Sequence, residues 1–157
     1  MTLVPLDVLR FRHALSHAPE CAVGHTTAAK AWEAIKDAAN QAGGAVLHGG
    51  LGPGLCAALV SGRENSDTTQ RLIAVLVHWL CSEHSPTRDQ AIGVFGDADA
   101  GAATSVTRVP RARDFAFGLL RRDIAVTARM ALQAETMRYL ACVKMLAKVP
   151  ETADGGT

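Results

Sequence analysis

The sequence predicts an all-α protein, a single compact bundle of about five to six helices that ends in a long C-terminal helix. Apolar residues make up 48% of the chain while aromatic residues make up only 4%, a balance that suits close-packed, alanine-rich helices better than a β-sandwich. Apolar residues also recur at spacings of three and four, the period of an amphipathic helix. With 157 residues, the chain is long enough for one domain with a real core, which we place at residues 1–150, followed by a disordered tail at 151–157.

The first third of the chain predicts two helices. The first covers residues 7–17 and is broken by the segment 19–24, which contains a proline and a glycine. Thr26 or Thr27 can cap the second helix, whose apolar stripe predicts an end near Gly43.

A glycine-rich segment follows at residues 48–55 (HGGLGPGL). A phosphate-binding P-loop requires Lys followed by Ser or Thr directly after its glycines, but here the next cation is Arg63. A dinucleotide-binding turn requires a β-branched strand before it, and none is present. We interpret the segment as a corner in which Gly49 and Gly50 end one helix and Pro53 lies in the first turn of the next.

The rest of the chain predicts two more helices around an irregular segment. Ser66 or Asp67 caps a strong fourth helix with apolar residues at helical spacing (Leu72, Val75, Leu76, Trp79 and Leu80). Residues 85–110 lack periodicity and predict a mobile loop or insertion. The last helix is expected from about residue 114 to 148, with a possible bend at Arg121-Arg122 and a fresh start at Asp123.

The histidines and cysteines do not have the paired spacing of a zinc module. The candidates are His78, Cys81 and His84, the pair Cys21 and His25, and the pair His13 and His17. On a continuous helix, His78 and His84 lie about 120° apart, which disfavours a shared ion. We therefore expect surface histidines, buried cysteines that act as small core residues (Cys21, Cys56, Cys81 and Cys142), no metal and no cofactor.

No motif for catalysis is present either. Residues 96–101 resemble the start of a calcium loop, but its twelfth position is Arg108 instead of the required Glu. The chain has no G-x-S-x-G motif and no close carboxylate pair in an apolar context. We expect the protein not to be an enzyme.

The charge distribution is the strongest functional signal. Residues 108–148 hold nine basic and three acidic side chains, a net charge of +6, and the whole chain carries +1. Guanidinium groups bind phosphate oxygens, so this region predicts contact with a nucleic-acid backbone. The alternative is a solvated helix face. We see no aromatics interleaved with the arginines and expect sequence-independent binding without base stacking. The candidate binding residues are Arg111, Arg113, Arg121, Arg122, Arg129 and Lys144.

The sequence gives no sign of membrane insertion or export. No apolar run approaches the roughly 20 residues that span a bilayer. The N-terminus lacks the basic and apolar regions of a signal peptide, so we expect a cytoplasmic protein that makes no membrane contact.

The order of these features resembles a known family. Gly50-Leu51-Gly52 opens a short apolar helix, a later helix ends in Trp79-Leu80, and Leu119-Leu120 leads into a long alanine-rich helix. Over residues 26–148 this resembles the small α-helical subunit of type III-B CRISPR effector complexes, the Cmr module. The chain departs from the family pattern at His48-Gly49, Pro53-Gly54 and Tyr139-Leu140, where other residues are usual.

The resemblance implies a non-catalytic subunit in antiviral defense. Its copies would stack head to tail beside the other Cmr-module subunits and contact guide or target RNA through phosphate. Two alternatives stay open: a helical protein–protein adaptor without nucleic-acid contact, and a metal-dependent or hydrolytic enzyme.

Overall fold

The computed structural model describes residues 4–22, 24, 27–60, 66–95 and 109–149, and within these ranges it contains helices and no strands. The prediction of an all-α bundle is confirmed, with slightly more helices than expected. The elements are α1 (Leu6–His17), the 3-10 helix η1 (Ala18–Cys21), α2 (Ala28–Gly49), α3 (Leu51–Leu59), α4 (Ser66–Leu80), α5 (Arg88–Phe95), α6 (Val109–Arg121) and α7 (Val126–Lys148).

Helix α4 forms the centre of the bundle and contacts every other helical element named above. Its consecutive apolar residues from Leu72 to Val77 each expose 3% or less of their surface, and Trp79 exposes 1%. The sequence predicted an amphipathic helix with one apolar stripe. A helix that is apolar on all sides belongs in the interior, because each face needs another element to cover it.

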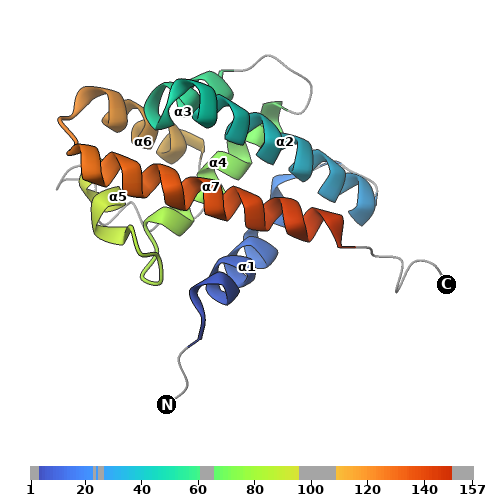
Figure 1. The fold of residues 1–157 in the computed structure, drawn as a ribbon. Coiled ribbons are helices and arrows are strands. Elements are labelled where there is room, and N and C mark those ends of the chain that lie inside the picture. Colours follow the sequence, from blue (N-terminus) through green and yellow to red (C-terminus); the bar gives the residue numbers. More distant parts are fainter. Residues whose placement is uncertain (1–3, 23, 25–26, 61–65, 96–108, 150–157) are drawn as a thin grey trace.

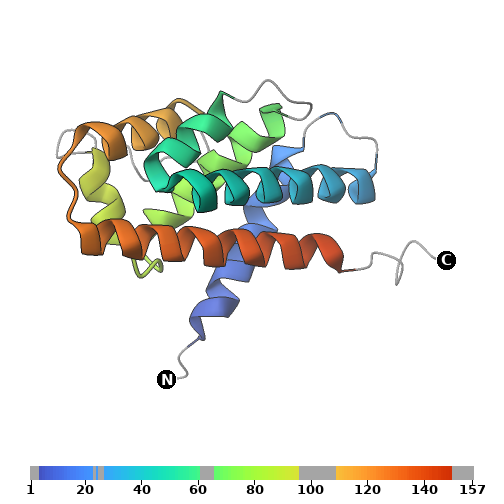
Figure 2. The ribbon, with the colours of Figure 1, turned by 45° about the horizontal axis from the view of Figure 1, so that its top comes forward.

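The two longest helices cover this centre together. Helices α2 and α7 run alongside each other in opposite directions, as both views of the ribbon show (Figures 1 and 2). Helix α1 crosses α7 at a steep angle (Figure 2). The predicted cap of α2 is confirmed at Thr27, whose side chain accepts a hydrogen bond from the Lys30 N–H at 3.2 Å.

The glycine segment is a corner between α2 and α3, as expected. Gly50 joins the helices with φ +84°, in the left-handed region that favours glycine. The expected end of the second helix near Gly43 is wrong. The helix continues to Gly49, with Gly43 buried in it beside Met137 and Leu140 of α7. This packing overrides the weak helix propensity of glycine.

Two further glycines let the neighbouring helices approach α3 closely. A Cβ at Gly54 would lie 2.5 Å from the carbonyl oxygen of Ala45 in α2. A Cβ at Gly52 would lie 3.1 Å from Leu120 Cδ2 of α6. The G-L-G-P-G spacing therefore reflects helix packing, and α3 is fitted tightly between α2 and α6.

Two expectations about the second half need correction. Residues 85–110 are not one irregular loop, because 88–95 form α5, which buries Ala91, Val94 and Phe95. The predicted long final helix is divided into α6 and α7 by a linker at 122–125, which confirms the alternative of a bend at Arg121-Arg122. Residues 96–108, which include the rejected calcium loop, and the expected tail at 151–157 lie outside the described ranges.

The close approach at Gly54 makes a direct prediction. We expect Gly54→Ala to lower the free energy of unfolding by about 1–3 kcal/mol, because the added methyl collides with rigid α2 backbone. Gly44→Ala is the matched control. Its Cβ would meet nothing within 4 Å, so this variant should raise the free energy of unfolding by about 0.5–1 kcal/mol. Urea unfolding of both variants measures this, and equal effects would contradict the packing account.

Candidate functional site

The six predicted nucleic-acid-binding residues do not form one surface. Arg111, Arg113 and Arg121 belong to α6, Arg122 lies in the linker, and Arg129 and Lys144 belong to α7. Lys144 follows Arg129 by fifteen residues, about 22 Å along the helix. The predicted binding residues therefore divide between the α6–α7 corner and the far end of α7.

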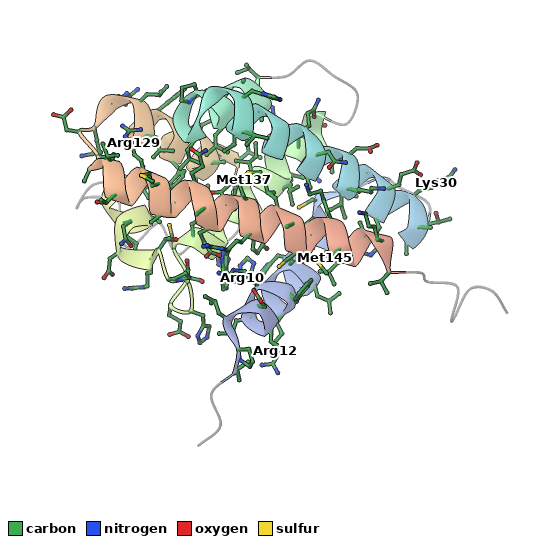
Figure 3. The ribbon with its side chains drawn as sticks, viewed as in Figure 1. Arg10, Arg12, Lys30, Arg129, Met137 and Met145 are labelled. Atoms are coloured by element: carbon green, nitrogen blue, oxygen red, sulfur yellow. The ribbon has the colours of Figure 1, made fainter. Side chains whose placement is uncertain are left out.

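Two of these arginines cap the C-terminal ends of neighbouring helices. Arg129 Nη2 donates to the Leu119 carbonyl at 2.6 Å, and its Nε donates to the Ile124 carbonyl at 3.3 Å. Arg122 Nη2 donates to the Phe95 carbonyl, the last residue of α5, at 3.0 Å. The final carbonyls of a helix lack partners within the helix and carry partial negative charge, so guanidinium groups stabilise them. Figure 3 shows Arg129 at the α6–α7 corner.

The polar side of α7 is largely covered. Helical spacing places Arg129, Gln133 and Thr136 on one side of this helix, yet Thr136 is fully buried and Gln133 is half-buried. The reason is that α7 packs against α2 as well as against α1 and α4, so the helix has two buried sides. The guanidinium of Arg129, which we expected to bind phosphate, makes hydrogen bonds to backbone carbonyls of the protein itself.

Two of the exposed basic groups, Arg113 and Arg121, lie on the outer face of α6. Arg113, Phe117 and Arg121 follow each other at intervals of four residues, share one row of the helix and are all exposed. The Arg121 guanidinium lies 5.4 Å from the centre of the Phe117 ring. We saw no aromatic among the basic residues in the sequence, and this was wrong: Phe117, 43% exposed, lies between the two arginines.

A cleft between α5 and α6 adjoins this row. Its volume is about 390 Å³. The residues that line it are Val94, Phe95, Asp114, Phe117, Gly118, Arg121 and Arg122. Arg111 is half-buried nearby, with its guanidinium carbon 4.3 Å from the centre of the Phe95 ring and Nη1 3.5 Å from Asp114 Oδ2.

A second group of polar residues is buried where α1, α4 and α7 meet. Arg10 of α1 makes two hydrogen bonds to Glu135 of α7, Nε to Oε2 at 2.6 Å and Nη2 to Oε1 at 2.7 Å. Trp79 of α4 donates its indole N–H to the same Oε2 at 2.9 Å. The side chains of Arg10 and Glu135 are 6% and 1% exposed. Figure 3 places Arg10 where α1 meets α7.

Three histidines continue this buried group toward one end of α1. His13 Nδ1 lies 2.6 Å from the Tyr139 hydroxyl, and His13 Nε2 lies 2.7 Å from His78 Nδ1. His17, one turn further along α1, has its ring centroid 4.4 Å from that of His13 and 5.0 Å from that of His78. The Tyr139 ring stacks on Trp79 at 5.8 Å, which joins the two groups.

Burial favours the neutral forms of His13 and His78. The pKa of His13 is lowered to about 3, mainly by burial and to a smaller extent by the charges of His17 and His78. Burial likewise lowers the pKa of His78, with a smaller contribution from His17. A neutral imidazole keeps one unprotonated nitrogen, which can accept a hydrogen bond or bind a metal ion.

Sequence spacing could not reveal these groups, because 65 residues separate His13 from His78 and 125 separate Arg10 from Glu135. One feature of the sequence does indicate the buried ion pair. Glu135 lies in the buried stripe of α7 with Leu132 and Tyr139, at spacings of three and four, and a carboxylate in such a stripe requires a buried partner. Helix α1 supplies the partner of this carboxylate. Its buried residues are Arg10 and Ala14, while its Leu15 is 58% exposed.

The remaining sequence predictions concern cysteines and membranes. All four cysteines are free thiols, and Cys21, Cys81 and Cys142 are buried as expected, whereas Cys56 is half-buried. His25, the proposed neighbour of Cys21, lies outside the described residues. Among the described helices, none combines the length and apolar character that crossing a bilayer requires.

Comparison of the chain with protein-family models, with curated proteins and with solved structures finds no match.

The lowered pKa of His13 predicts a pH-dependent stability. Below about pH 6.5 the unfolded chain binds a proton at this residue, while the folded protein binds it only near pH 3. Stability should therefore fall as the pH drops from about 6.5 toward 3, by at most about 1.4 kcal/mol per pH unit for this group.

Urea unfolding between about pH 7 and 5 measures the effect. His13→Gln should reduce the slope of stability against pH, whereas His84→Gln, at an exposed position, should leave it unchanged. An unaltered slope in His13→Gln would contradict the view that the lowered pKa of His13 causes the pH dependence.

Proposed function

We propose that the protein is a non-catalytic small subunit of a Cmr-type, RNA-guided CRISPR complex and that it contacts RNA through the outer face of α6. The family resemblance supports the first part, because its motifs coincide with features of the fold. The Gly50-Leu51-Gly52 segment forms the corner that fits α3 against α6, and Leu119-Leu120 belong to the helix at that contact.

The observation that carries the RNA contact is the exposed row of Arg113, Phe117 and Arg121 beside a cleft lined by Arg122. Two guanidinium groups about 12 Å apart along one helix can bind phosphates of the same strand. The ring between them offers one surface on which a base can stack. Contacts of this kind are independent of sequence, as expected for a subunit that lies along a guide–target duplex.

Exposed apolar residues near the same corner support self-association. Leu120, Val126 and Met130 expose 52%, 71% and 66% of their surfaces. Large apolar side chains that gather at the surface favour contact with another protein. Copies of this chain, or the other subunits of the complex, are the partners that the resemblance implies.

Binding of single-stranded RNA, measured by filter binding over a range of salt concentrations, tests the proposal. We expect Arg113→Glu combined with Arg121→Glu to weaken binding and to reduce the slope of log affinity against log salt by about 1.4, the loss of two phosphate contacts. Among the described residues neither side chain makes a hydrogen bond that caps a helix, so the fold should be retained. Arg122 and Arg129 are unsuitable targets, because their replacement would remove helix-capping hydrogen bonds.

Arg12→Glu combined with Lys30→Glu is the matched control, since it makes the same charge change at exposed positions on α1 and α2 (Figure 3). This control should bind almost like the unmodified protein. Equal losses in both double variants would indicate a general charge effect. Absence of RNA binding at low salt would refute RNA contact by this chain and favour the protein–protein adaptor.

A further inference from the structure

The three histidines at the end of α1 have the geometry of a metal site. One ligand nitrogen from each of His13, His17 and His78 lies within 4.8 Å of the other two. His13 and His17 are four residues apart on α1 and so share one face, and α4 supplies the third imidazole from across the interface. In a tetrahedral zinc site with bonds of about 2.05 Å, neighbouring ligand atoms lie about 3.3 Å apart. Small side-chain rotations would bring the three rings to that spacing.

We propose that His13, His17 and His78 bind one divalent transition-metal ion of the zinc class. Neutral imidazole nitrogens are the preferred ligands of such ions, and no charged side chain is needed to hold them. Binding replaces the hydrogen bond between His13 Nε2 and His78 Nδ1 with two bonds to the metal. The ion joins α1 to α4 and stabilises the docking of α1.

The surroundings of His13 match those of a metal ligand. Metal-bound histidines almost always place their second ring nitrogen against a hydrogen-bond partner, which fixes the ring and its tautomer. The Tyr139 hydroxyl occupies that position, 2.6 Å from His13 Nδ1. When Nε2 binds the ion, Nδ1 carries the proton and donates to the tyrosine oxygen. Tyr139 is itself fixed by complete burial and by its stacking on Trp79.

The site also has a route to solvent. His17 lines a cavity of about 240 Å³ together with Glu20, Cys21 and Arg71. An ion with three histidine ligands takes a water or another small ligand as its fourth, and this cavity provides room for one.

Titration of the untagged protein with Zn²⁺, in competition with a chromogenic chelator, tests the proposal. We expect one ion per chain with a dissociation constant in the micromolar range or tighter, and a thermal unfolding midpoint that rises with Zn²⁺ and returns after EDTA. Co²⁺ bound at the same site should give the visible absorption of a tetrahedral ion.

Variants separate this site from other histidines. His17→Ala should abolish the one-to-one binding. Within the described part of the chain the half-buried His17 side chain makes ring contacts with His13 and His78 and no hydrogen bond, so the fold should persist. Tyr139→Phe keeps the ring and should weaken binding about 10- to 100-fold by releasing His13. His48→Ala and His84→Ala, at exposed positions, should bind normally. No stoichiometric Zn²⁺ or Co²⁺ binding, or binding that survives His17→Ala, would overturn the proposal.

Discussion

The buried ion pair between Arg10 and Glu135 is the interaction on which the arrangement of α1, α4 and α7 depends. Leu6, Leu9 and Ala14 of α1 pack on the core. The helix is also held by two hydrogen bonds from Arg10 to Glu135 of α7, and Glu135 in turn accepts the indole N–H of Trp79 in α4. Breaking a buried pair leaves an uncompensated charge and typically costs about 3–5 kcal/mol. The position of His13 and His17 beside His78 follows from this docking.

Glycines determine how the helices pack at the other end of the molecule. The left-handed Gly50 turns the chain from α2 into α3, and the missing side chains of Gly52 and Gly54 let α6 and α2 approach α3 closely. The same packing fixes α6 so that Arg113, Phe117 and Arg121 face solvent. Each end of the bundle thus presents its own polar group: a buried one at α1 and an exposed, basic one at α6. The first suits a bound ion, and the second suits a phosphate backbone.

The sequence predicted what depends on local periodicity and turn chemistry. The all-α class, the Thr27 cap and the corner at Gly49-Gly50 are examples, because each depends on neighbouring residues. What it could not predict depends on contacts between distant residues. The sequence indicated that Arg129 binds phosphate, because the residue lies on the polar side of its helix. In the structure its guanidinium donates to a backbone carbonyl at the end of α6. Likewise His13 and His78 have no common motif, and only the crossing of α1 over α4 joins them.

A double-mutant cycle on the buried pair tests the central claim, that Arg10 and Glu135 hold α1 in place. The variants are Arg10→Met, Glu135→Gln and their combination, and the glutamine leaves Trp79 an acceptor. We expect Arg10→Met to lower the free energy of unfolding in urea by about 3 kcal/mol or more. The double variant should lose about 1–3 kcal/mol less than the sum of the single losses. Single losses below about 1 kcal/mol that simply add would contradict the account.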